Sequence, residues 1–311
     1  MKKRLSSRNS IESLGEFGLI SRIKKHLRSQ KGVVFGIGDD AAVLIGTGKK
    51  YQLFTIDTIV EDVDFVRRKA TPEQIGWKAL AINLSDIAAM GGVPKSAVVS
   101  LTLPRDTSVR FVDGFYKGIR DLAQRFHVAI VGGDFSRGSK IVSSIALLGE
   151  VEKSRVVFRN GSRTGDLICV TGKLGGSILG KHLNFIPRLK EGRFLAEHGV
   201  SSMIDISDGF IQDLHHLVSE NRLGFVIDEK SIPISRAARK LARANYKKSL
   251  YHALYDGEDF ELLFTVSPSR FRIFSRLWRK RFSTPLAVVG KVARSGRKWP
   301  MPGRHLGFQH F

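Results

Sequence analysis

The stretch Thr71-Pro-Glu-Gln-Ile-Gly-Trp-Lys-Ala-Leu-Ala-Ile-Asn-Leu-Ser-Asp-Ile-Ala-Ala-Met-Gly-Gly92 has the composition of a long, mostly apolar helix. Thr71 offers an N-cap, and Pro72 suits the first helical turn. We therefore predict a helix over Pro72–Met90. Asp86 stands near its end beside Ser85, where little side-chain bulk blocks access to the carboxylate.

Apolar runs alternate with helical patterns on both sides of this helix, which indicates an α/β (α+β) fold rather than a helical bundle. We expect strands at Tyr51–Ile56, Ala97–Leu103, Ala129–Val131, Ile141–Val151, Leu167–Thr171 and Phe225–Ile227. We expect further helices at Phe17–Arg28, Ser108–Phe126, Phe210–Ser219, Ser235–Ala244 and Pro268–Lys280. A length of 311 residues suffices for two domains, each with its own core. The polar turn Asn160–Gly165 marks their junction, so we predict domains of residues 1–155 and 156–311.

The charge balance is strongly basic, with 51 Lys and Arg against 29 Asp and Glu and a formal net charge of +22. No stretch interleaves aromatic residues with the basic ones, so we do not expect a nucleic-acid partner. No run of apolar residues is long enough to predict a membrane helix. The basic start lacks the apolar stretch of a secretory signal, and the single Cys169 cannot form an internal disulfide. We therefore expect a cytoplasmic protein.

Six aspartates are the candidate functional residues, and most of them have Gly, Ala or Ser as neighbours. They are Asp40, Asp57, Asp86, Asp134, Asp205 and Asp208. We expect Asp57 just beyond one strand and Asp134 at the end of another, where a buried carboxylate is costly unless it is paired or metal-bound. Mg²⁺ takes carboxylate oxygens and shares its other positions with phosphates. The pattern therefore predicts a Mg²⁺ or nucleotide site for phosphoryl transfer.

Each aspartate also has a structural interpretation. Asp39 and Asp40 can shape a turn, Asp86 can pair within its helix, and Asp208-Gly209 is a common turn dipeptide. Spacing alone does not show that the six side chains converge.

The segment Gly175-Gly-Ser-Ile-Leu-Gly-Lys-His182 nearly matches a P-loop. That motif requires Ser or Thr after the Lys, because the hydroxyl binds Mg²⁺, and His182 cannot replace it. We interpret the segment as a Gly-rich turn that leads into a helix.

An ordered set of motifs resembles the thiamine-monophosphate kinase family, within the superfamily of aminoimidazole ribonucleotide synthetase. The motifs are Gly15–Ile20, Gly38–Ala41, Thr55–Asp57, Trp77–Gly92, Val131–Asp134, Asp205–Gly209 and Gly257–Leu262. The resemblance implies a two-domain α/β subunit, with an N-terminal domain that binds ATP and Mg²⁺ and pairs its sheet with that of a second subunit in a homodimer. It also implies that the substrates are ATP and thiamine monophosphate, that several Mg²⁺ ions are bound, and that the product is thiamine diphosphate.

The resemblance also implies residue roles. It places metal ligands at Asp40, Thr55, Asp57, Asp86, Asp134, Asp205 and Asp208, and ATP contacts at Tyr116, Gly133, Asp134, Arg159 and Ser207. It places contacts to the acceptor at Asp64, Glu258 and Phe308. Within this set, the expected catalytic residues are Asp57, Asp86, Asp134, Arg159 and Asp208.

Two positions depart from the family pattern, both on the acceptor side. Asp64 stands where the family usually has His, and Phe260 where it has Tyr. Two alternatives therefore accompany the kinase hypothesis: a superfamily relative that uses ATP on another acceptor, and a basic RNA-binding protein without catalysis. For the kinase, a phosphate monoester acceptor is largely dianionic at neutral pH and needs no general base, so we expect direct in-line transfer.

Overall fold

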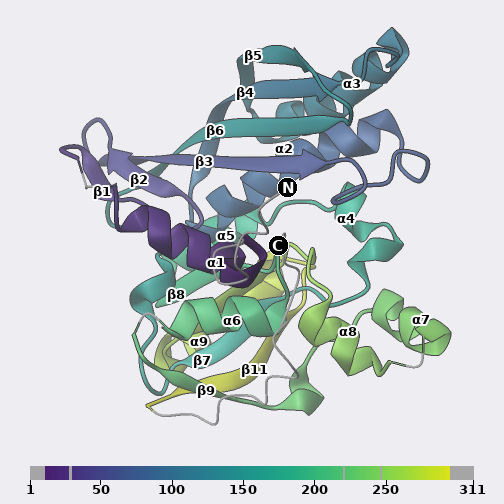
Figure 1. The fold of residues 1–311 in the computed structure, drawn as a ribbon. Coiled ribbons are helices and arrows are strands. Elements are labelled where there is room, and N and C mark those ends of the chain that lie inside the picture. Colours follow the sequence, from purple (N-terminus) through teal and green to yellow (C-terminus); the bar gives the residue numbers. More distant parts are fainter. Residues whose placement is uncertain (1–10, 28–29, 220, 246, 295–311) are drawn as a thin grey trace.

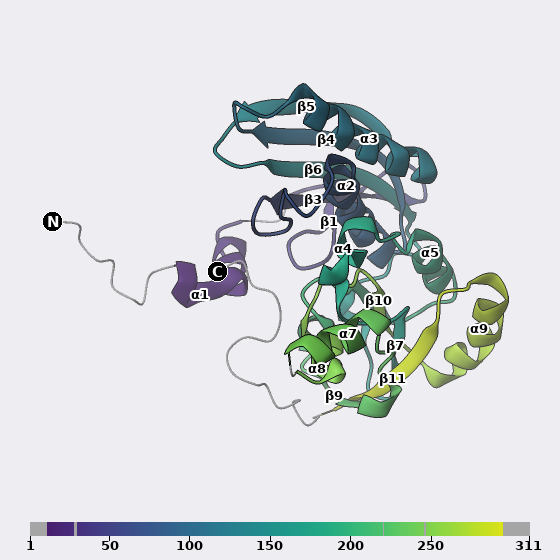
Figure 2. The same cartoon turned by 90° about the vertical axis from the view of Figure 1, so that its right-hand side faces the viewer.

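A six-stranded sheet forms the N-terminal half of the structure, a computed structural model that describes residues 11–27, 30–219, 221–245 and 247–294. Its strands are β1 (Val33–Phe35), β2 (Ala42–Ile45), β3 (Lys50–Val60), β4 (Val93–Leu103), β5 (Ala129–Arg137) and β6 (Val142–Glu152). The order is β1-β2-β3-β6-β4-β5, in which β4 and β5 are parallel and the other pairs antiparallel. Helices α2 (Pro72–Ala89) and α3 (Val109–Phe126) lie on one face of this sheet (Figure 2).

A five-stranded antiparallel sheet forms the second half, below the first in Figure 1. Its order is β8-β10-β7-β11-β9, built from β7 (Leu167–Thr171), β8 (Ser202–Asp205), β9 (Gly224–Ile227), β10 (Leu262–Val266) and β11 (Leu286–Ala293). The accompanying helices are α4 (Lys181–Asn184), α5 (Leu189–Glu197), α6 (Phe210–Ser219), α7 (Arg236–Asn245), α8 (Ser249–Tyr255) and α9 (Pro268–Arg281). Near the N-terminus, α1 (Ile11–Lys24) kinks at Gly15 and projects from the rest of the molecule (Figure 2).

Helix α2 joins the two halves. Thr71 and Gln74 form a capping box and Pro72 occupies the first turn, which confirms the predicted start. The helix is buried on nearly all sides because it packs between the first sheet and the elements α4, α5 and β8 of the second half. Its approach to α5 is close: a Cβ on Gly192 would lie 2.2 Å from the carbonyl oxygen of Ala88, so this position requires glycine.

The largest hydrophobic core runs through both halves. It includes Leu84 and Ile87 of α2, Phe194 of α5 and Trp278 of α9 in a single cluster. A second cluster fills the opposite face of the C-terminal sheet, beneath α6 and α8. One core cluster therefore spans both halves through α2, and the C-terminal half has a second cluster of its own. The boundary between residues 155 and 156 stays a prediction.

The expected strands and helices all occur, several with shifted ends. β7 and α6 have the predicted bounds, while α1 begins at Ile11 rather than Phe17. β3 and β5 extend beyond their expected ends, so Asp57 and Asp134 lie inside strands, and both predicted positions are wrong. The elements that were not predicted are β1, β2, β8, β10, β11, α5 and α8. Among the described residues, no helix is both long and apolar enough to cross a membrane.

Candidate active site

A cavity of about 420 Å³ lies where β3, α2 and the C-terminal half meet. The predicted site residues that line it are Asp40, Thr55, Asp57, Asp64, Asp86, Arg159, Asp205, Ser207, Asp208 and Glu258. β2 pairs with β3 as far as Phe54, and the backbone amide of Asp57 then donates to the side chain of Asn83 on α2. The end of β2 therefore leaves the following part of β3 facing the cavity.

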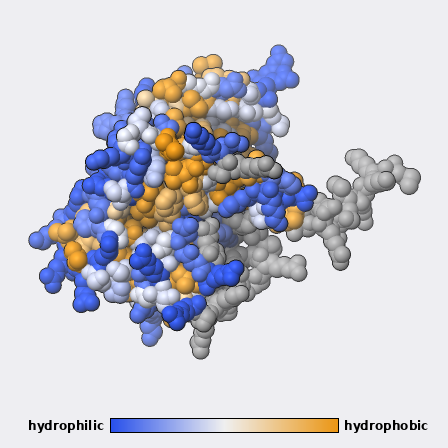
Figure 3. Space-filling view, turned by 90° about the vertical axis from the view of Figure 1, so that its left-hand side faces the viewer, coloured by the Kyte–Doolittle hydropathy of each residue, from blue (hydrophilic) through white to orange (hydrophobic). Residues whose placement is uncertain are grey.

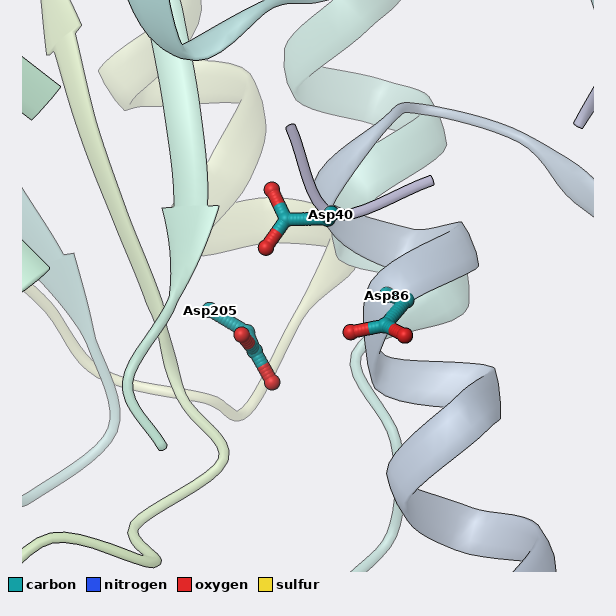
Figure 4. A group of neighbouring side chains, drawn as sticks. All are labelled: Asp40, Asp86 and Asp205. Atoms are coloured by element: carbon teal, nitrogen blue, oxygen red, sulfur yellow. The ribbon is translucent and has the colours of Figure 1, made fainter. Parts of the chain in front are cut away.

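Three carboxylates from distant parts of the chain converge at the cavity wall. Asp40 precedes β2, Asp86 lies on α2 and Asp205 ends β8, and one oxygen of each lies within 4.8 Å of the other two (Figure 4). Hydroxyl groups fix two of them: Thr55 donates to Asp86 at 2.5 Å and Ser85 to Asp205 at 2.6 Å. This convergence is what the spacing of the aspartates could not show.

The cluster fits a divalent cation. Burial, followed by the charge of Asp40, raises the pKa of Asp205 to about 8. Burial and the neighbouring charges of Asp57, Asp205 and Asp40 likewise raise the pKa of Asp86 well above its ordinary value. Like charges this close disfavour ionisation of the whole set, and a hard cation with oxygen ligands removes that conflict. The residue types and separations therefore suit Mg²⁺.

Asp39 and Arg159 form a second charged group beside the cluster. The Arg159 guanidinium contacts Asp40 at 2.5 Å, and its backbone amide donates to the fully buried carboxylate of Asp39. Burial, together with the charge of Asp40, raises the pKa of Asp39 to about 7. Burial alone would lower the pKa of Arg159, but the two carboxylates raise it above its ordinary value. Asp39 was not assigned a role from the sequence, although its position beside Asp40 was a usable signal.

The turn after β8 and the start of α6 each contribute one further carboxylate. Asp208 accepts a hydrogen bond of 2.9 Å from Gln212, while Asp213 accepts one from the backbone amide of Gly209. Asp213 is buried, and burial followed by the charges of Asp208 and Asp205 raises its pKa well above the ordinary value. Asp213 was not predicted, because a carboxylate in the first turn of a helix usually has only a capping role.

Comparison with known proteins gives a consistent result. Residues 38–151 match the family model described as AIR synthase related protein, N-terminal domain. Over 294 residues the chain is 39% identical to the thiamine-monophosphate kinase of Rhodopirellula baltica, which covers 91% of each protein. It is 36% identical to that of Aquifex aeolicus over 284 residues, or 85% of this chain and 90% of that protein. The solved structure of AaThiL complexed with AMPPCP and TMP has a TM-score of 0.86 at 32% identity, covering 98% of this chain and all of that one. The chain belongs to the thiamine-monophosphate kinase family. It is an enzyme, a kinase, with the α/β fold that the resemblance implied.

The two positions that depart from the thiamine-monophosphate kinase pattern have distinct structural roles. Asp64 lines the cavity, and its carboxylate accepts a hydrogen bond of 2.7 Å from the amide of Val60. Phe260 is buried and stacks on Phe185 with ring centroids 4.1 Å apart. Phe260 thus packs against the core and also lines the cavity, as Asp64 does. The third predicted acceptor contact, Phe308, lies outside the described residues.

A lysine that was not predicted lies at the same end of the cavity. Lys78 of α2 is 1% exposed, and its ammonium group donates to the carbonyl of Asp64 and to the carboxylate of Glu258. The basic residues that follow Asp64 in the sequence, Arg67, Arg68 and Lys69, do not line this cavity, and the Arg67 guanidinium lies over the ring of Phe111. Lys78 therefore brings the positive charge to Asp64 and Glu258.

Three predicted residues of the kinase site, Tyr116, Gly133 and Asp134, do not line this cavity. Asp57 of β3 pairs with Ile145 of β6, Ile145 with Val99 of β4, and Val99 with Gly133 of β5. β5 therefore lies three strands from β3, about 14 Å at the usual strand spacing. Asp134 pairs with Ser100, which places its side chain on the face opposite α2 and α3. Tyr116 instead lines a groove of about 530 Å³ between α3 and β5.

The segment that nearly matches a P-loop does not offer its amides to a phosphate. The amide of Gly175 donates to Asp259, that of Gly176 to Asp256, and the Lys181 ammonium pairs with Glu261. The chain continues into a 3₁₀ turn and then α4, as expected for a Gly-rich turn before a helix.

Proposed function

We propose that this chain transfers the γ-phosphoryl group of ATP to thiamine monophosphate, which yields thiamine diphosphate and ADP. The observation that carries this proposal is a single cavity that contains the cluster of Asp40, Asp86 and Asp205 at one wall and Asp64 and Glu258 at another. A phosphoryl donor with its cations and a phosphate acceptor can therefore meet within one enclosed space. The similarity to AaThiL, whose structure is complexed with AMPPCP and TMP, supports these two substrates.

Mg²⁺ would be held by Asp40, Asp86 and Asp205, with Thr55, Asp57 and Asp208 as further oxygen donors at the cavity wall. When bound, Mg²⁺ neutralises phosphate charge and polarises the phosphoryl oxygens. The chain contributes rigidity: hydroxyl donors hold two of the carboxylates, so the ligand set exists before nucleotide binds.

The acceptor is its own nucleophile. A phosphate oxygen of thiamine monophosphate attacks the γ-phosphorus of ATP, the bond from that phosphorus to the bridging oxygen breaks, and ADP leaves with the electron pair. No proton has to be removed, because the acceptor is largely dianionic at neutral pH. Arg159 offers guanidinium donors to the phosphates while Asp40 fixes its position, and Ser207 lies on the same wall.

We further propose a homodimer formed by the open face of the six-stranded sheet. This face carries apolar side chains at Phe54, Ile56, Val93, Val98 and Leu148, of which Ile56 is 64% and Leu148 40% exposed. Figure 3 shows apolar atoms gathered over the upper and middle part of one side of the molecule. An apolar area of this kind is typical of an interface between subunits.

A dimer through this face also offers a role for the residues that do not line the cavity. Asp134 projects from the open face, so it would approach the second subunit rather than its own cluster. We propose that Asp134 and Gly133 act at the site of the partner; Tyr116 lies in the groove between α3 and β5 on the other face, so its contact with the nucleotide stays a prediction. A Cβ on Gly133 would lie 2.0 Å from the carbonyl oxygen of Val99 on β4, so the close pairing of β4 and β5 requires glycine there.

We place the reaction in the cytoplasm, where ATP is abundant and a buried thiol such as Cys169 stays reduced. We propose no second function.

The test is to incubate the purified chain with Mg²⁺, ATP and thiamine monophosphate, then identify the products by mass. The expected products are ADP and thiamine diphosphate. ADP formation that does not depend on thiamine monophosphate, with no thiamine diphosphate, would refute the proposal.

A further inference from the structure

Lys78 connects the two halves of the chain at the acceptor end of the cavity. It lies on α2, in the N-terminal half, and its Nζ donates to the carbonyl of Asp64 at 2.7 Å. The same ammonium group donates to the carboxylate of Glu258, which belongs to the loop before β10 in the C-terminal half. Lys78 therefore sets the separation between the two segments that face the acceptor.

The loop that carries Glu258 has a strained backbone. Gly257, Glu258 and Phe260 all have positive φ, at 73°, 53° and 48°. A non-glycine residue in this region costs on the order of 1 kcal/mol or more, so two of them persist only where neighbouring contacts hold them. Three contacts do so within the C-terminal half: Glu258 N–H donates to Ser207 at 2.6 Å, Phe260 N–H to Ile206 at 2.8 Å, and Ser177 Oγ to the Glu258 carbonyl at 2.7 Å.

These contacts fix the backbone of the loop but not the side chain of Glu258. The ion pair with Lys78 directs that carboxylate across the cavity toward α2. Stability gives no reason for an ion pair at this position, since a buried ammonium loses its hydration and a pair of apolar residues of similar volume is often as stable or more stable. Removal of Lys78 alone is different, because it leaves the carboxylate of Glu258 without its cation.

We propose that Lys78 is a positioning residue that sets the affinity for the acceptor, by holding Glu258 and the Asp64 turn at a fixed separation; this inference rests on the proposed function. Lys78 acts through its two partners and does not contact the phosphoryl group in transit. Its loss would therefore weaken acceptor binding while nucleotide binding stays intact.

The experiment compares Lys78→Met with a matched control, Arg193→Met. Arg193 of α5 also pairs across the two halves, with Glu152 of β6 at 2.6 Å, but does not line the cavity. For Lys78→Met we expect a KM for thiamine monophosphate at least tenfold higher and a KM for ATP within twofold of the wild type. Arg193→Met should leave both KM values within twofold. Equal effects of Lys78→Met on both KM values, or no effect on either, would overturn the proposal.

A double-mutant cycle with Glu258→Gln tests the route of the effect, and calorimetric binding of thiamine monophosphate gives a readout that does not depend on turnover. If Lys78 acts through its two partners, the loss of affinity in the double variant is smaller than the sum of the two single losses, and Lys78→Arg keeps most of the affinity. Additive losses would overturn the proposal. If Lys78→Met folds poorly, Glu258→Gln and Lys78→Arg still test it. Failure of the proposed function is distinct, since the wild type itself would then neither bind thiamine monophosphate nor form thiamine diphosphate.

Discussion

The hydroxyl of Thr55, on β3, donates a hydrogen bond of 2.5 Å to the carboxylate of Asp86, on α2. This bond joins the sheet to the helix at the point where β2 ends and the cavity begins. It orients Asp86 toward Asp40 and Asp205 and leaves its other oxygen for a ligand. A residue of a mostly apolar helix therefore becomes part of the carboxylate cluster.

Asp86→Asn should lower kcat by roughly 10²- to 10³-fold or more, because it removes a charged ligand at the centre of the cluster. The amide can still accept from Thr55, so the thermal midpoint at pH 8 should be unchanged or higher. Steady-state kinetics and calorimetric Mg²⁺ titration check both effects. Asp228→Asn, at an exposed position after β9, serves as the control and should behave like the wild type. A kcat near normal at saturating Mg²⁺ would show that Asp86 is no ligand.

Asp64→Asn should lower the KM for thiamine monophosphate by about threefold to tenfold with little change in kcat. The change removes a carboxylate beside a dianionic acceptor, and about 1 kcal/mol of repulsion corresponds to about fivefold in affinity. The amide oxygen of Asn can still accept from Val60. Asp64→His should act in the same direction. The control is Asp62→Asn in the same turn, where the side chain is exposed and pairs with Lys140. An unchanged KM in Asp64→Asn would mean that this carboxylate does not face the acceptor.

Hybrid dimers test whether Asp134 acts at the site of the partner. Asp57→Asn and Asp134→Asn should each be inactive alone. When the two are unfolded together and refolded, half the dimers are mixed, and each mixed dimer has one site with both carboxylates intact. Activity should therefore return to about a quarter of the wild-type value. No recovery from a mixture that contains mixed dimers would place Asp134 at its own site.

Two further variants control the hybrid experiment. Leu148→Asp puts a charge on the open sheet face and should give a monomer by light scattering, with no complementation. Val226→Asp, on an exposed position of the other sheet, should remain dimeric.

The buried Asp259 predicts a pH dependence of stability. Burial is the main cause that raises its pKa to about 7 in the folded state, from 3.8. The folded state therefore holds a proton that the unfolded state loses, so the contribution of Asp259 to stability falls as pH rises from about 4 to about 7 and is constant above. Asp259→Asn lacks this titration. Its free energy of unfolding, relative to that of the wild type, should therefore rise by about 2 to 3 kcal/mol between pH 5 and pH 8. Urea unfolding at both values measures the gain, and an equal difference at both would contradict it.

Local signals explain which elements could be predicted from the sequence. The capping box and Pro72 define the start of α2, and β7 and α6 stand between clear turn residues. β10 was missed because Leu262–Val266 is a short, fully buried apolar run, which has no periodicity to separate strand from helix. The ends of β3 and β5 could not be predicted because tertiary pairing with β6 and β4 extends both strands.

The site was predictable in composition but not in geometry. The motifs identified Asp40, Asp86 and Asp205, yet their approach to within 4.8 Å depends on how the two sheets pack around α2. Lys78 could not be predicted because its role depends on a partner 180 residues away. The role of Asp134 could not be predicted from the sequence, because its side chain projects from the open face of the sheet and does not line the cavity of its own chain. In the proposed dimer, that role depends on the second subunit.

The common core beneath both sheets also has a consequence for how substrates enter. Two domains with separate cores can move apart about a hinge. Here Leu84, Phe194 and Trp278 pack in one cluster, and such a motion would disrupt it. The shared core thus fixes the position of Asp86, in the N-terminal half, relative to Asp205, in the C-terminal half. The carboxylates are therefore already assembled before a nucleotide binds, without closure of the two halves. A chimera that combines the halves of two relatives would need matching side chains across the shared core.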